Sequence, residues 1–143
     1  QITNYLFRKD ILLKVNGYNE FLKFNEDFDL ILRMAKIKMF RGINRVGFIQ
    51  HIRENSWSKS EPYITFNGVE EFLDNAFDKQ LLPINEIEQR RKDNRLTLVK
   101  KLLAKRSSWS DAVPYINEAF DIIKPVNFKE FILFFLNKIL KRL

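Results

Sequence analysis

The chain has 143 residues, a formal net charge of +7 and no cysteine. Its hydrophobic content of 45%, which includes 14 phenylalanines, is enough for a folded core and argues against a disordered chain. The lack of cysteine excludes a disulfide framework and a thiolate metal site, and no apolar run approaches the ~20 residues that cross a membrane. We therefore expect a soluble, cytoplasmic protein.

The first 60 residues mix short elements of different kinds. Apolar and aromatic spacing predicts strands over 3–8, 39–40 and 45–51, and helices over 9–15 and 26–37. A loop is expected between the two helices. The sequence thus predicts an α+β fold for this part of a chain that is mainly helical overall.

Beyond residue 60 the hydrophobic periodicity is helical. Four helices are predicted: from Asn67 to before Pro83, from Pro83 to about residue 105, from 110–114 to before Pro125, and from Asn127 onward. The pairs Asn67 with Glu70 and Asn127 with Glu130 each have the spacing of a capping box. We place a domain boundary at this change, between residues 1–60 and residues 61–143.

The segment Asn25-Glu26-Asp27-Phe28-Asp29 puts three carboxylates into four positions just before an apolar helical run. Asn25 can cap the predicted helix, so Glu26 and Asp27 fall in its first turn. Free backbone N–H groups and the helix dipole stabilise negative charge there, and a carboxylate beside a cleft could take a proton from an incoming hydroxyl. Capping of the helix start, without catalysis, is the other interpretation.

Several motifs surround this segment in a fixed order. They are Phe7-Arg8-Lys9, Asn16-Gly17-Tyr18-Asn19-Glu20, Glu26-Asp27-Phe28-Asp29-Leu30-Ile31-Leu32-Arg33 and His51-Ile52-Arg53-Glu54-Asn55-Ser56. The order resembles the second half of the catalytic domain of family 2 glycosyltransferases, whose motifs read Phe-Arg-Lys/Arg, Gly-Gly-Tyr/Phe-Asp-Glu and Glu-Asp-x-Asp-Leu-x-x-Arg. The resemblance covers residues 2 to 60. Asn16 replaces the first Gly of the second motif, and Asn19 replaces its Asp.

The resemblance implies a fold and a place within a larger enzyme. Residues 1–60 would form the C-terminal, acceptor-side part of a GT-A (Rossmann-like α/β) domain, and residues 61–143 a small helical bundle. A nucleotide-binding half with an Asp-x-Asp metal motif would precede Gln1, so the chain alone would be inactive. Because half a sheet exposes strand edges, we expect self-association through Tyr5, Phe7, Phe48 and Ile49.

The resemblance also implies a reaction. Such enzymes transfer a sugar with inversion from a nucleotide-sugar donor to a saccharide or lipid-linked acceptor, and the Asp of the Glu-Asp pair, here Asp27, is the general base. Glu26 is expected to orient the acceptor hydroxyls. Asp29 faces elsewhere on the helix, and Arg33 four residues later predicts a structural ion pair.

His51 and Arg53 complete the candidate site. His51, the one histidine of the chain, would complete a site for a divalent metal (Mn or Mg) whose other ligands lie outside the chain. An ordinary surface or core histidine is the alternative. Arg53 belongs to Gln50-His51-Ile52-Arg53-Glu54, which partly matches the Gln-x-x-Arg-Trp element of processive synthases, and we assign it to substrate binding. Glu54 in place of the tryptophan favours transfer of a single sugar.

The basic residues are densest at 90–95. A solvated helix face is the favoured interpretation, and nucleic-acid binding is not expected because no recognition motif accompanies the charge. The competing class of function for the whole chain is a non-enzymatic, basic helical module that binds an anionic partner or a membrane surface.

The last predicted helix is amphipathic. Its apolar stripe comprises Phe128, Phe131, Ile132, Phe135, Leu136, Ile139, Leu140 and Leu143, opposite Lys129, Lys138, Lys141 and Arg142. Packing of this stripe onto the other helices is the favoured interpretation. The alternative is a helix in the interface of a membrane, at its cytoplasmic face.

Overall fold

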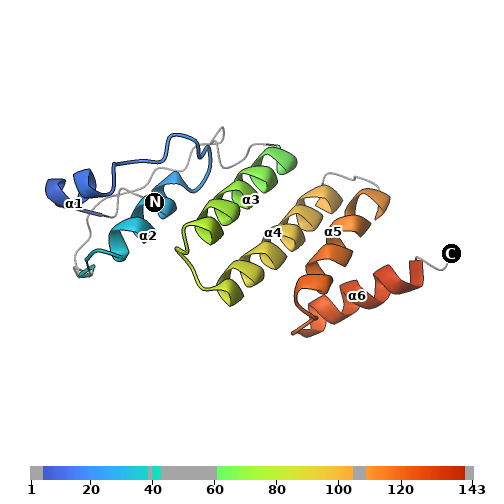
Figure 1. Cartoon of the computed structure of the whole chain (residues 1–143). Coiled ribbons are helices and arrows are strands. Elements are labelled where there is room, and N and C mark those ends of the chain that lie inside the picture. The colour runs from blue at the N-terminus through green and yellow to red at the C-terminus, as the bar shows by residue number, and fades with distance from the viewer. Residues whose placement is uncertain (1–4, 39, 43–60, 105–108, 141–143) are drawn as a thin grey trace.

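The structure is a computed structural model that describes residues 5–38, 40–42, 61–104 and 109–140, and the regular secondary structure of these residues is entirely α-helical (Figure 1). The helices are α1 (Lys9–Lys14), α2 (Glu26–Ala35), α3 (Pro62–Asp78), α4 (Ile84–Ala104), α5 (Trp109–Ile122) and α6 (Phe128–Leu140).

The helices α3, α4 and α5 lie side by side and run alternately in opposite directions, with α4 in the middle (Figure 1). Helix α2 lies against α3 at one end of this row, with α1 beyond it, and α6 packs against α5 at the other end. The row therefore separates the acidic segment of α2 from the C-terminal helix.

The expected α+β fold, with part of a GT-A (Rossmann-like α/β) domain, is wrong, because the described residues contain no strand. Residues 5–8 and 40–42 are neither helical nor paired in a sheet. The ring of Tyr5 instead stacks on Phe7, with 5.9 Å between ring centroids, and meets Phe40 edge-on at 5.7 Å. The alternating aromatic residues Tyr5 and Phe7 thus pack against other rings and do not belong to a β-strand. The predicted strand at 45–51 lies outside the described residues.

Helix α3 begins five residues earlier than expected. It begins at Pro62, which occupies the first turn where a missing N–H costs nothing, so Asn67 lies inside the helix and does not cap it. The cap at Asn127 is confirmed, because Glu130 N donates to Asn127 Oδ1 at 3.1 Å. The Glu130 carboxylate accepts from Asn127 Nδ2 at 2.8 Å and from Val126 N at 3.0 Å, so the return bond of the predicted capping box comes from the side chain of Asn127 and from the preceding residue.

Three apolar clusters form the core. The first joins α1 to α2 through Ile11, Leu30 and Met34. The second joins Leu22 to α3 and α4, and the third joins α4 to α5 through residues such as Leu96, Ile116 and Phe120. Since Leu22 packs with residues of α3, apolar contacts cross the boundary expected at residue 60, which itself stays a prediction.

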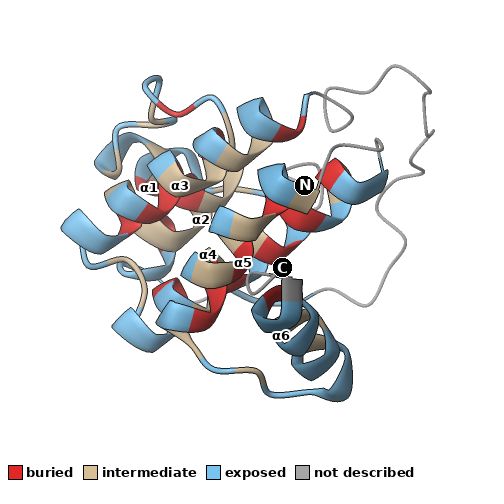
Figure 2. Cartoon of the chain, turned by 90° about the vertical axis from the view of Figure 1, so that its right-hand side faces the viewer, coloured by how far each residue is buried: buried red, intermediate tan, exposed pale blue. Residues whose placement is uncertain are grey.

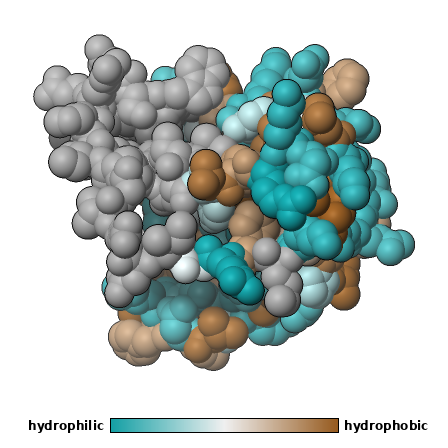
Figure 3. Space-filling view, turned by 90° about the vertical axis from the view of Figure 1, so that its left-hand side faces the viewer, coloured by the Kyte–Doolittle hydropathy of each residue, from teal (hydrophilic) through white to brown (hydrophobic). Residues whose placement is uncertain are grey.

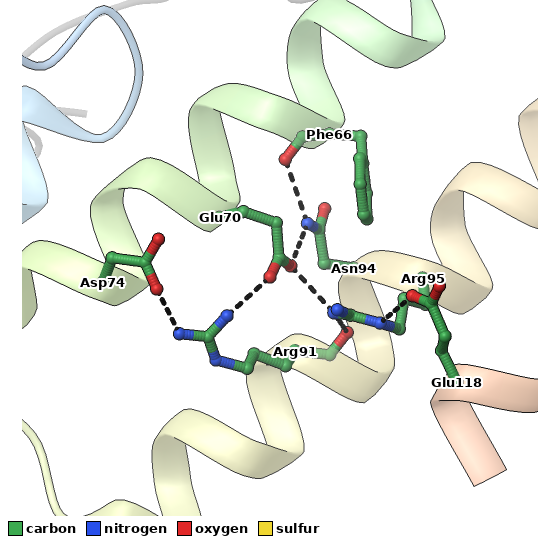
Figure 4. Close-up of polar contacts among 7 residues, drawn as sticks. All are labelled: Phe66, Glu70, Asp74, Arg91, Asn94, Arg95 and Glu118. Atoms are coloured by element: carbon green, nitrogen blue, oxygen red, sulfur yellow. Dashed lines mark hydrogen bonds and ion pairs between the residues drawn. The ribbon is translucent and has the colours of Figure 1, made fainter. Parts of the chain in front are cut away.

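The basic run of α4 is not simply a solvated face, because its charges bind partners within the chain. Glu70 of α3 accepts hydrogen bonds from Arg91 at 2.7 Å, from Asn94 at 2.8 Å and from Arg95 at 3.0 Å (Figure 4). Arg95 also reaches Glu118 of α5 at 3.0 Å. These bonds join the three long helices, and much of the positive charge of the run is neutralised inside the fold.

Helix α6 packs against the bundle with the side opposite to the one that we expected. Leu133 and Phe134 pack on the cluster of α4 and α5, whereas Phe128, Phe135 and Ile139 of the predicted stripe are 78%, 58% and 56% exposed. Figure 2 shows α6 mostly in the colour of exposed residues. The prediction that this stripe packs onto the bundle is therefore wrong for its described residues.

Within the described residues, no helix combines the length and the apolar character needed to cross a membrane.

Candidate functional site

The turn after α1 takes an unusual backbone conformation. Asn16 and Gly17 both have positive φ angles, 57° and 62°, and Gly17 N donates to Leu12 O at 3.1 Å to close the end of the helix. Glycine adopts this left-handed region freely, and asparagine is the side chain that tolerates it best. Both residues of this turn are therefore of types that accept the left-handed conformation.

Arg33 of α2 holds this turn. Its guanidinium donates to Asp29 Oδ2 at 2.8 Å, to Gly17 O at 2.8 Å and to Val15 O. The Asp29 carboxylate is fully buried, and the Arg33 side chain is 16% exposed. The predicted structural ion pair of Asp29 with Arg33 is confirmed, and it fixes α2 against the end of α1.

Asn75 of α3 is a part of this arrangement that the sequence did not reveal. Its amide nitrogen donates to Asp29 Oδ1 at 2.7 Å, and its amide oxygen accepts from Asn19 Nδ2 at 3.3 Å. One feature of the sequence could have identified Asn75: it is a polar residue between Phe72 and Ala76, on the buried side of a helix. Such a residue usually has a hydrogen-bond partner across the interface.

Glu26 and Asp27 occupy the first turn of α2, as predicted, and both are partly exposed. Asn25 is at the cap position but has a left-handed backbone, and its side chain makes no capping bond. Instead, Phe28 N donates to Asp27 Oδ1 at 2.7 Å. Two partly exposed carboxylates therefore lie at the positive end of the helix dipole, where negative charge is stabilised.

A hollow of about 440 Å³ opens beside the turn after α1. It is lined by Val15, Asn16, Tyr18, Asn19, Glu20, Phe21, Arg33 and Lys79. Neither Glu26 nor Asp27 is among its lining residues. The face at this end of the molecule shows separate hydrophobic patches between hydrophilic side chains (Figure 3), and the side chains of Leu13 and Phe21 are among the exposed apolar ones.

The described residues offer no set of metal ligands. They contain no group of three His, Asp or Glu side chains that could hold an ion. Asp27-Phe28-Asp29 has the sequence pattern Asp-x-Asp. The Asp29 carboxylate, however, is buried and bound to Arg33 and Asn75, so it does not fit the role of a metal ligand. The predicted metal ligand His51 and the predicted substrate-binding Arg53 lie outside the described residues.

Comparison of the chain with protein-family models, with curated proteins and with solved structures found no match.

Proposed function

We propose that this chain supplies the acceptor-activating part of an inverting glycosyltransferase of the family 2 type, with Asp27 as the general base. The Asp27 carboxylate would take the proton of an acceptor hydroxyl. The oxygen of that hydroxyl would at the same time attack the anomeric carbon of a nucleotide sugar, and the nucleoside diphosphate would leave. Glu26, next in the same helical turn, would orient the acceptor hydroxyls.

The observation that supports this proposal is the division of roles among three neighbouring carboxylates. Asp29 is fully buried and bound to Arg33, whereas Glu26 and Asp27 are partly exposed at the start of α2. The bonds from Arg33 and Asn75 hold α2 in place and would keep its first turn in a fixed position. A base on a rigid element is aligned for proton transfer before the substrate arrives.

The turn after α1 also supports the proposal. Two successive left-handed residues, Asn16 and Gly17, occupy the positions where the related motif has two glycines. Asn16, which departs from that motif, is of the residue type that, after glycine, best tolerates this left-handed conformation. The all-helical architecture of the described residues does not favour the enzyme over a non-enzymatic helical module, so the choice between them depends on activity.

The decisive assay uses the complete gene product. It would be incubated with a panel of nucleotide sugars, glycan and lipid-linked acceptors, and Mn or Mg, and release of nucleoside diphosphate would be followed. We expect acceptor-dependent release by the complete gene product and none by the 143-residue chain alone. Absence of release by the complete product with every donor would contradict the proposal and favour the binding module.

A further inference from the structure

The face that α6 leaves uncovered is apolar and continuous. Six side chains of the helix are between 44% and 78% exposed: Phe128, Phe131, Ile132, Phe135, Leu136 and Ile139. At about 100° per residue, they fall within an arc of about 140° around the helix axis. Isolated exposed apolar residues need no explanation, but a contiguous face of this kind marks an interaction site.

The orientation of α6 is fixed by polar contacts on its other side. Glu130 Oε2 accepts a hydrogen bond from the fully buried Lys92 of α4 at 2.7 Å. Asn137, which is also buried, donates to Asn117 of α5 at 2.7 Å. Turning the apolar face inward would break both contacts and leave polar groups unpaired in the interior. The face therefore stays outside in the folded chain.

The charges of α6 border this face in a regular way. Lys129 lies at one edge of the apolar arc and Lys138 at the other, about 180° apart around the axis. Both are exposed, and the Lys138 ammonium lies 4.6 Å from the centre of the Phe134 ring. The one acidic residue of the helix, Glu130, is on the packed side. The outer surface of α6 thus offers apolar and cationic groups only.

We propose that the outer face of α6 binds the surface of an anionic lipid bilayer, with the helix axis parallel to the membrane. The six apolar side chains would enter the boundary between headgroups and acyl chains, and the two lysines at the edges would reach the anionic headgroups. With 13 residues the helix is about 20 Å long, too short to span a hydrocarbon core of about 30 Å. This inference does not depend on the proposed glycosyl transfer.

The test measures co-sedimentation of the full chain with vesicles of phosphatidylcholine alone or mixed with phosphatidylglycerol. We expect binding to the mixed vesicles that weakens as salt is raised, and little binding to phosphatidylcholine alone. Replacing Lys129 or Lys138 with glutamine should weaken binding about fivefold for each charge. Lys100→Gln, at an exposed lysine of α4, is the matched control and should change binding by less than twofold.

The apolar contribution is tested with Phe135→Ser and Ile139→Ser, both at exposed positions where folding should be retained, as circular dichroism would verify. Each should weaken vesicle binding about tenfold, whereas Leu13→Ser on the exposed surface of α1 should not. Equal losses for the α6 variants and for Leu13→Ser would overturn the proposal. The proposal would also be overturned if the chain bound no vesicles and light scattering showed a dimer that Phe135→Ser abolishes. In that case a second copy of the chain would cover the face.

Discussion

Asp29 Oδ2 and Arg33 Nε lie 2.8 Å apart, and this carboxylate has no exposed surface. Two residues earlier on the same helix, the Asp27 side chain is partly exposed. The pairing of Asp29 thus separates a structural carboxylate from a candidate catalytic one within a single turn. It also gives the two residues different expected responses to substitution.

Asp29→Ala should destabilise the chain strongly. It would leave the Arg33 guanidinium half-paired in a largely buried position and would remove the acceptor of the Asn75 amide. Breaking a buried ion pair by removing one partner costs about 3–5 kcal/mol. Urea denaturation of the purified chain, followed by circular dichroism, measures this loss in the free energy of unfolding.

Asp27→Ala is the matched control for that experiment. It removes a carboxylate from the first turn of the same helix, where such a contact contributes about 1 kcal/mol or less. Similar losses for the two substitutions would show that the division of roles between Asp27 and Asp29 is wrong.

Gly68→Ala tests the contact between α3 and the loop before α2. A Cβ at Gly68 would overlap Phe24 Cδ2 and would lie 2.7 Å from Phe24 Cγ. Alanine favours the helix by about 1 kcal/mol, but overpacking costs about 1–3 kcal/mol, so we expect net destabilisation in thermal or urea unfolding.

The same substitution should reverse its sign when Phe24 is replaced by alanine. The clash is then gone and only the helix preference of alanine remains, so Gly68→Ala should stabilise the Phe24→Ala variant by about 0.5–1 kcal/mol. Equal effects of Gly68→Ala in the two backgrounds would refute the predicted contact.

Acid should weaken the attachment of α6. Burial raises the pKa of Glu130, but hydrogen bonds from Lys92, Val126 N and Asn127 outweigh burial and hold this pKa below its ordinary value of 4.5. A carboxyl with a lowered pKa in the folded state contributes stability above its unfolded pKa and loses it as the pH falls through the folded value.

Glu130→Gln provides the comparison for this pH dependence. The wild-type chain should be more stable than the variant at pH 7, and the difference in unfolding free energy should shrink as the pH falls below about 4.5. Denaturation curves of both proteins between pH 7 and pH 3 measure it. A difference that stays constant across this range would exclude the proposed contribution of Glu130.

Local rules predicted the helices with good accuracy because capping and periodicity act within a few residues. Helix α2 begins at Glu26 and α6 follows Asn127, both as expected. The pair of Asp29 with Arg33 was also predictable, since residues four apart face each other on a helix. Pro62 could have predicted the true start of α3, but the capping-box spacing at Asn67 misled the assignment.

The features that the sequence did not reveal depend on contacts between distant residues. The inward side of α6 follows from the bonds of Glu130 to Lys92 and of Asn137 to Asn117. Hydrophobic content alone favoured the opposite side, because it ignores the cost of unpaired buried polar groups. The aromatic residue Tyr5 resembled a strand residue for a similar reason, since its partner Phe40 lies far along the chain.

The central claim is that Asp27 is the base of a glycosyl transfer, and the direct measurement is the turnover of the Asp27→Asn variant of the complete gene product. The substitution keeps the size of the side chain and removes its capacity to accept a proton. Turnover should fall about a hundredfold or more, the usual contribution of a general base, while nucleotide-sugar binding and the unfolding temperature stay near the wild-type values. Turnover within a factor of a few of wild type would contradict the account.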